Sequence, residues 1–252
     1  MATSGTTAFN LDFAELAEEA FERAGREMRT GYDLRTARRS MNLLTIEWAN
    51  RGINLWTIDE GYLQLSKGVS AYSLPTDTVD VCEMNVREND GTLATQSDTH
   101  LNRISVSTYA AIPNKLTQGK PIQALVHRLG TDGSYKSGSS SGTSTTATPF
   151  ITVWPVPDKD STYRLYYYRV RRIEDATAIG GTTTTSAVNQ DLPFRFLPCA
   201  VAGLAYYIAM KIPELAPRLQ ILKQDYEEQF ALAAAEDREK TSARFVPSIG
   251  YH

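Results

Sequence analysis

The 252-residue sequence contains few of the side chains that enzymes and metalloproteins commonly use. It has two cysteines and three histidines. Two cysteines as far apart as Cys82 and Cys199 form neither a disulfide framework nor a zinc-ligand pair, so we expect both to be reduced, buried thiols. His100 and His127 belong to no H-x-x-x-H or H-x-E pattern, which argues against a metal site.

Long hydrophobic runs and a dominant charge are also missing. The most apolar segment, "LPCAVAGLAYYIAM" at 197–210, is shorter than the roughly 20 residues that span a bilayer, so it predicts a buried helix. The first ten residues lack the basic and apolar regions of a signal peptide, and we expect a mobile leader there. A net charge of -3 argues against strong binding of nucleic acid by the whole protein surface.

Motifs for phosphate binding and nucleophilic catalysis are missing or out of context. The chain contains no Walker A or G-x-G-x-x-G loop. Gly138, Ser140 and Gly142 match G-x-S-x-G, but they lie in a Ser/Thr/Gly run instead of a strand-to-helix turn, and the only later histidine is His252. The sequence therefore predicts no catalytic residue, no metal and no cofactor.

What the sequence does contain is the composition of a folded protein, with 42% hydrophobic and 22% charged residues. Apolar side chains recur at helical spacing near both ends of the chain. They predict helices over 11–29, 33–50, 193–213 and 214–240. On the last helix, five apolar residues form one seam: Leu219, Leu222, Tyr226, Phe230 and Ala233.

Between the helices, β-branched and aromatic residues predict an inserted β domain of about six strands. "LWTIDEGYLQL" (55–65) and "VSAYSL" (69–74), separated by "SKG", predict a hairpin. Further strands are expected in "TVDVCEMNVRE", "IQALVHRL", "FITVWPV" and "TYRLYYYRV", with a short helix begun by Ser105 or Ser107. The low-complexity tract 129–148 predicts a flexible hairpin loop.

The predicted fold class is therefore α+β, with a four-helix body and an inserted antiparallel β domain. The expected boundaries are a mobile leader at 1–10, an N-terminal helical pair at 11–54, the β domain at 55–172, a linker at 173–192, a C-terminal helical pair at 193–240 and an extended docking tail at 241–252.

The run "YRLYYYRVRR" has two interpretations. As an ordinary strand it would place Tyr163, Leu165 and Tyr167 on one face and aromatic residues on the other, which favours contact with a neighbouring subunit. The interface residues expected on this basis are Tyr62 (beside Leu63), Tyr72, Tyr166, Tyr168 and Arg169. Alternatively, exposed aromatics would stack on sugars, or a nucleic-acid site would use Tyr166, Tyr168, Arg169, Arg171 and Arg172.

Several segments together resemble a known family. "ARRSMN" (37–42) in the second helix precedes "WANRGINLWTIDEGYLQL", and "YSLP" (72–75) follows. In "LPFRFLPCAVAGLAYYIAMKIPELAPRLQILKQDYEEQF" (192–230), a proline-initiated helix precedes a long acidic helix. This order resembles the tail adaptor of short-tailed bacteriophages, the tubular tail protein A or gatekeeper family. The pattern covers roughly half of the chain.

The resemblance implies a structural head-to-tail adaptor in the virion neck, assembled in the host cytoplasm. Its partners would be the portal protein, the tail nozzle protein and further copies of itself in a ring of about twelve, with DNA passing through the lumen. The C-terminal tail resembles the segment that reaches the portal, through Phe245, Val246, Pro247, Ile249 and Tyr251.

Overall fold

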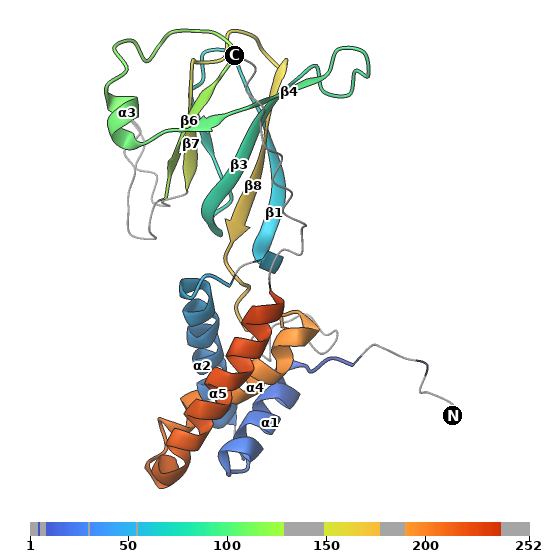
Figure 1. Cartoon of the computed structure of the whole chain (residues 1–252), viewed down its shortest axis with the longest axis vertical. Helices are drawn as coiled ribbons and strands as arrows, with labels where there is room; N and C mark the ends of the chain where they lie inside the picture. The colour runs from blue at the N-terminus through green and yellow to red at the C-terminus, as the bar shows by residue number, and fades with distance from the viewer. Residues whose placement is uncertain are drawn as a thin grey trace, which may run out of the picture. The chain divides into compact units, whose positions relative to one another are not determined.

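The computed structural model describes residues 5, 9–29, 31–53, 55–128, 149–176 and 190–237. The chain divides into two compact units. The helical unit takes in the chain up to Trp56 and from Ile173 onward, and the β unit takes in Thr57–Arg172 (Figure 1). The predicted α+β class, with a β region inserted between helices, is confirmed.

Helix α1 spans Phe13–Ala24 and has strong signals at both ends. Asp12 and Glu15 form a reciprocal capping box, which satisfies backbone N–H groups that the first turn leaves free. The helix ends at Gly25, whose φ of 96° is left-handed. The predicted end near residue 29 is therefore wrong, because this glycine stops the helix earlier.

Helix α2 spans Gly31–Asn50 and starts two residues before the predicted position. It buries one face, which includes Ala37, Met41, Leu44 and Trp48. Gly52 follows with a φ of 83°, which turns the chain into a short 3-10 helix at Leu55–Thr57.

The C-terminal half of the helical unit begins with a 3-10 turn at Phe194–Phe196 and continues as α4, Leu197–Ala209. A second 3-10 segment, Pro213–Arg218, leads into α5, Leu219–Glu236. The predicted seam on α5 is confirmed, since Leu222, Tyr226 and Ala233 are buried and Leu219 and Phe230 pack beside them. Among the described residues, no helix is both long enough and apolar enough to cross a membrane.

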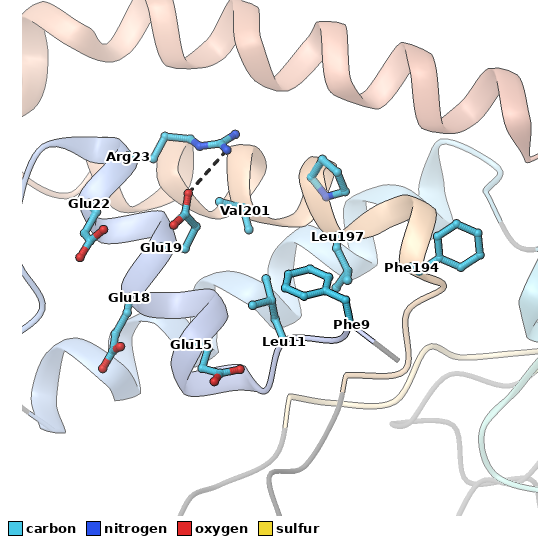
Figure 2. Close-up of a pocket in the computed structure, with 11 residues that line it drawn as sticks. Phe9, Leu11, Glu15, Glu18, Glu19, Glu22, Arg23, Phe194, Leu197 and Val201 are labelled. Atoms are coloured by element: carbon cyan, nitrogen blue, oxygen red, sulfur yellow. Dashed lines mark ion pairs between the residues drawn. The ribbon is translucent and has the colours of Figure 1, made fainter. Parts of the chain in front are cut away.

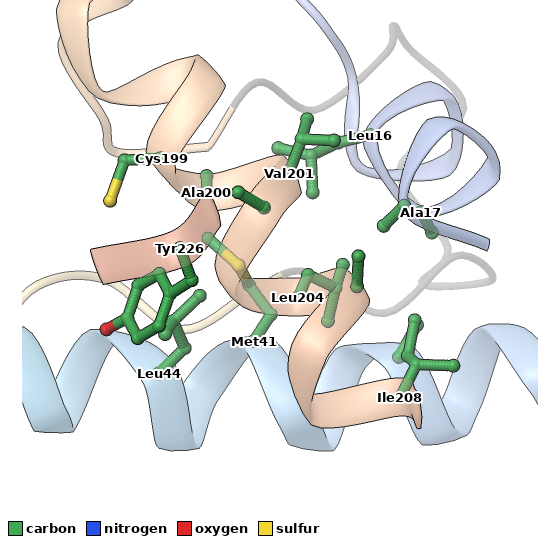
Figure 3. Close-up of a cluster of buried hydrophobic side chains, with 14 of the residues drawn as sticks. Leu16, Ala17, Met41, Leu44, Cys199, Ala200, Val201, Leu204, Ile208 and Tyr226 are labelled. Atoms are coloured by element: carbon green, nitrogen blue, oxygen red, sulfur yellow. The ribbon is translucent and has the colours of Figure 1, made fainter. Parts of the chain in front are cut away.

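Helix α4 forms the centre of the helical unit, as its apolar sequence predicts. Side chains from α1, α2 and α5 pack around it in one cluster, part of which is drawn in Figure 3. Gly203 permits the closest approach, because a Cβ there would lie 2.8 Å from Leu44 and 2.9 Å from Tyr226. Deep in this core, Trp48 donates a hydrogen bond of 3.1 Å to the Tyr226 hydroxyl.

A polar network at the edge of this core connects α2, α4 and α5. Arg51 donates two hydrogen bonds of 2.9 Å to Glu227, and its guanidinium lies 4.3 Å from the centre of the Phe230 ring. Glu47 accepts hydrogen bonds from Tyr207 at 2.5 Å and from Tyr226 at 3.2 Å. The bidentate Arg51–Glu227 pair fixes two helices in register.

This pair predicts a specific acid sensitivity. The Arg51 guanidinium holds the pKa of Glu227 below its usual range. The pair therefore stabilises the helical unit fully above the unfolded-state pKa of about 4.3, and this stability is lost as the pH falls through the lower folded-state pKa. We expect Glu227→Gln to reduce the loss of stability between about pH 5 and pH 3, measured by urea unfolding at each pH.

The matched control for this prediction is Glu228→Gln. Glu228 lies next in sequence and accepts a hydrogen bond from the neutral side chain of Gln224. This variant should keep the pH dependence of the unchanged protein. Equal slopes for the two variants would contradict the role given to Arg51.

The β unit contains two four-stranded sheets. The first has the order β1-β8-β3-β4, formed by Ile58–Gln64, Tyr163–Arg171, Thr78–Glu88 and Ser97–His100. The second has the order β2-β7-β6-β5, formed by Ala71–Ser73, Phe150–Trp154, Gln123–His127 and Asn102–Arg103. The short helix α3, Val106–Ala110, is capped by Ser105, one of the two expected residues.

The predicted hairpin between 55–65 and 69–74 is wrong. β1 pairs with β8, whereas β2 pairs with β7 in the other sheet. The intervening turn directs the chain from one sheet to the other. Gly68 has a φ of 77°, and the Tyr72 hydroxyl bonds to the backbone of Ser66 and Val69. Turn residues between two apolar runs are compatible both with a hairpin within one sheet and with a turn that leads from one sheet to the other. The local sequence therefore did not distinguish these two arrangements.

The strand count and direction also differ in part from the prediction. Eight strands lie within the described residues, not six, because β4 and β5 are short and polar and carry no apolar alternation. All pairs between strands are antiparallel except β5–β6, which is parallel. The expected pairing of β6 with β7 is present.

Candidate functional site

A hollow of the helical unit lies between α1 and the start of α4 (Figure 2). This α1–α4 groove has a volume of about 730 Å³. Its apolar lining includes two aromatic rings that are largely in solvent, Phe9 at 76% and Phe194 at 78% exposure. The remaining apolar residues of the lining are Leu11, Leu197, Pro198 and Val201.

One side of the groove is acidic. Glu15, Glu18, Glu19 and Glu22 line it along α1, and Figure 2 shows the Glu18 and Glu22 carboxylates pointing away from α4. Arg23 compensates part of this charge, since it lies 3.7 Å from Glu19 and 3.5 Å from Asp225. The carboxylates of Glu18 and Glu22 have no hydrogen bond or ion pair within the described part of the chain. The groove suits an apolar partner that carries positive charge.

A second hollow, of about 640 Å³, lies at the other end of α4 and is basic. Arg26, Arg29, Arg39 and Lys211 line it, together with the single acid Asp33. Lys211 donates a hydrogen bond of 2.6 Å to Ser40, and burial together with the nearby Arg39 charge lowers the pKa of its ammonium group. The two ends of the helical unit therefore present opposite charge.

On the β unit, the expected interface residues Tyr62 and Tyr166 lie together. Their ring centres are 5.9 Å apart on neighbouring strands β1 and β8. Arg87 lies over the Tyr166 ring at 4.0 Å, and Arg164 lies over the Tyr62 ring at 5.0 Å. Tyr62 is 62% exposed, so this aromatic–arginine surface can receive another protein.

The inward and outward faces of β8 agree with the sequence interpretation. Tyr163, Leu165 and Tyr167 are buried in the core of the β unit. Tyr168 lies on the opposite face and is 39% exposed. The strand pattern thus located the exposed aromatics correctly.

Two other expected interface residues make contacts inside the β unit. Arg169 donates hydrogen bonds of 2.7 Å to Asp77 and 3.0 Å to Thr78, and it holds the pKa of the Asp77 carboxyl below its usual range. The Tyr72 hydroxyl is bound to the turn at Ser66 and Val69. Both side chains hold neighbouring segments together, and their part in a subunit contact stays a prediction.

The nucleic-acid interpretation of this strand has less support in the structure than in the sequence. Arg164 pairs with Asp90, and Arg169 and Arg171 both pair with Asp59. Aspartates so close to the guanidinium groups compete with phosphate for them. These arginines consequently favour strand-to-strand contacts over a phosphate-binding surface.

The cysteines and the two described histidines, His100 and His127, have other surroundings than a metal site. The described residues contain no group of three or more potential metal ligands. Cys82 is exposed, so the prediction that both thiols are buried is wrong for this residue; it lies on the solvent face of β3. Cys199 is buried in the helical core, and burial raises the pKa of its thiol to about 12. His127 stacks on Phe150 at 3.9 Å, and burial lowers its pKa.

Several sequence predictions fall on residues outside those that the structure describes. They are the loop 129–148 with its G-x-S-x-G match and the docking tail, including Phe245, Val246, Pro247, Ile249 and Tyr251. Conversely, the α1–α4 groove was not found from the sequence. Phe9 lies in the segment expected to be a mobile leader, and no local signal distinguishes the exposed Phe194 from the buried Phe196 two residues later.

Comparison with models of protein families identifies the family of this chain. The family model described as SU10 adaptor protein matches residues 11–248, which takes in both units. The chain belongs to the SU10 adaptor protein family. This confirms the resemblance to a phage adaptor at the level of a structural tail adaptor, a component of the virion that associates with other phage proteins. No curated protein matches the chain.

Proposed function

We propose that this SU10 adaptor family member is a head-to-tail connector that forms a ring, expected to contain twelve copies, between the portal and the tail nozzle. The family match over 11–248 carries this proposal, because it takes in the helical unit and the inserted β unit together. The proposed ring and its position in the neck rest on the resemblance of the sequence to the tail adaptors of short-tailed phages. The role requires binding surfaces and no catalytic group, which fits a chain without a catalytic constellation in its sequence.

The aromatic–arginine surface of the β unit supports a contact with the nozzle or with a neighbouring subunit. Tyr62 and Tyr168 offer exposed aromatic area, and tyrosine and arginine are among the residue types enriched at the energetically important positions of protein interfaces. A modest net charge of -3 is compatible with a lumen through which DNA moves without being retained, since each phosphate contact by lysine or arginine strengthens binding.

The tail prediction tests this function. Deleting residues 241–252 should abolish binding to the purified portal of the same phage, while circular dichroism shows an unchanged fold. Replacing Phe245, Val246 and Ile249 together with serine should weaken binding about a thousandfold, because burying each side chain contributes roughly 1.5 kcal/mol or more and 1.4 kcal/mol is tenfold in affinity. Mass photometry of portal mixed with each variant measures the change.

The matched control replaces polar tail residues, Thr241, Ser242 and Ser248, with alanine. This variant should bind the portal as the unchanged chain does. Portal binding that survives the deletion would reject the tail as the docking segment. Absence of the protein from the neck of mature particles, seen by low-resolution imaging, would reject the connector role itself.

A further inference from the structure

The solvent-facing side of α2 carries an unusual combination of apolar and basic residues. Tyr32, Leu43 and Ile46 are 63%, 54% and 42% exposed. At 3.6 residues per turn they share about a quarter of the helix circumference with Arg35 and Arg39. This α2 ridge lies opposite the buried face of the helix, which includes Ala37, Met41 and Leu44.

The arginines of the α2 ridge have no salt bridge or side-chain hydrogen bond within the described residues. Arg38, beside them on the same helix, has none there either, and Arg39 also lines the basic hollow. Thr36 lines that hollow too, with a buried hydroxyl oxygen that has no hydrogen-bond partner among the described residues. Uncompensated cations next to exposed apolar side chains are typical of a surface that a partner covers.

The α1–α4 groove has the complementary chemistry. It combines apolar side chains, with Phe9 and Phe194 exposed, and the unpaired carboxylates of Glu18 and Glu22. The two carboxylates are four residues apart on α1, and Arg35 and Arg39 are four residues apart on α2. Both pairs are therefore separated by about 6 Å along their helices, which permits one carboxylate to face each guanidinium.

The groove and the ridge cannot satisfy each other within one copy. α1 and α2 both turn their apolar faces toward α4, so the groove acids and the ridge arginines face away from the shared core. Their linings share no residue: the groove is at the start of α4, and the hollow beside the ridge is at its end. Two different, complementary surfaces on one chain produce head-to-tail contacts, which form a ring where the rotation from copy to copy closes.

We propose that the α2 ridge of one copy docks in the α1–α4 groove of the next copy, with Arg35 and Arg39 facing Glu18 and Glu22. This inference deepens the proposed connector function, because it names the surfaces that would join neighbouring subunits. It does not depend on the portal or on the C-terminal tail. A second copy is favoured over other partners because the charge and the spacing match on the same chain.

Directed disulfide exchange between copies tests this contact. All variants carry Cys82→Ser to remove the exposed native thiol. One copy carries Glu22→Cys, activated as a mixed disulfide with thionitrobenzoate, and the other carries Arg39→Cys. We expect release of thionitrobenzoate to be at least about tenfold faster than with a control cysteine, and 0.5 M salt to reduce the advantage, since salt screens exposed charges.

The matched control is Lys223→Cys on an exposed position of α5, which removes one positive charge as Arg39→Cys does. Each rate is divided by the reactivity of the same thiol toward a small disulfide, and circular dichroism verifies the fold of each variant. The reaction is run with the protein alone and with portal present. An advantage for Arg39→Cys in either mixture supports the contact, and equal corrected rates in both mixtures overturn it.

The two proposals fail separately. If Arg39→Cys reacts faster than the control but the protein is absent from the neck of the particle, the proposed interface stands and the connector function is rejected. If the protein is found in the neck but Arg39→Cys and Lys223→Cys exchange at equal rates, the connector function stands. The copies then contact each other through other surfaces. If portal protein, and not a second copy, protects the Arg39→Cys thiol, the ridge belongs to a portal contact and the inference is wrong.

Discussion

Replacing Phe196 with alanine is expected to lower the free energy of unfolding of the helical unit by about 3–5 kcal/mol, the range for deleting a large buried aromatic side chain. Phe196 is fully buried. Its ring lies 5.5 Å from Trp48 and 4.7 Å from Trp56 between ring centres. The cavity left by alanine would border both indoles, and the rigid packing around them limits collapse.

Tryptophan fluorescence during urea unfolding measures this effect, because Trp48 and Trp56 both report on the helical unit. Phe194→Ala is the matched control. Phe194 precedes Phe196 by two residues in the same 3-10 turn and is 78% exposed. Its loss should change stability by no more than about 0.5 kcal/mol. Equal destabilisation by the two variants would contradict the placement of Phe196 at the centre of the core.

Replacing Gly61 with valine is expected to destabilise the β unit by about 2 kcal/mol, although valine favours strands more than glycine does. Gly61 lies on β1 directly opposite Tyr167 on β8. A Cβ at position 61 would lie 2.5 Å from the Tyr167 ring, which covers the glycine. The ring would have to move out of the buried core of the β unit, where it is 3% exposed.

Amide hydrogen exchange in β1 and β8 measures this loss and separates the β unit from the helical unit. Glu60→Val, at the neighbouring exposed position, raises the strand preference without a clash and should leave exchange unchanged or slower. In a Tyr167→Ala background, Gly61→Val should add no further destabilisation, because the ring is gone. Slower exchange in the single Gly61→Val variant would show that strand preference outweighs the contact.

The places where sequence interpretation succeeded are those where a local pattern has one structural solution. The seam of Leu222, Tyr226 and Ala233 fixed the buried face of α5, because an amphipathic helix must cover its apolar stripe. The alternation in β8 likewise placed Tyr167 inside and Tyr168 outside. The family resemblance, confirmed as a phage adaptor, also came from the sequence.

The errors arose where the deciding contact is distant in sequence. The run "SKG" at 66–68 looked like a hairpin turn, yet β1 pairs with β8 about a hundred residues later. Gly25 ended α1 earlier than the apolar pattern suggested, because its left-handed φ overrode the periodicity. Cys82 was expected to be buried from its residue type, but its position on β3 places it in solvent.

The sequence by itself therefore determined the helices, most of the long strands and the insertion of the β region between two helical pairs, because these depend on periodicity over neighbouring residues. Only the tertiary structure placed Glu18, Glu22 and Phe194 in the lining of one groove, and paired Tyr62 with Tyr166. Residues so far apart in the chain become neighbours through packing on α4 or through strand register, and neither arrangement is encoded in any single stretch of sequence.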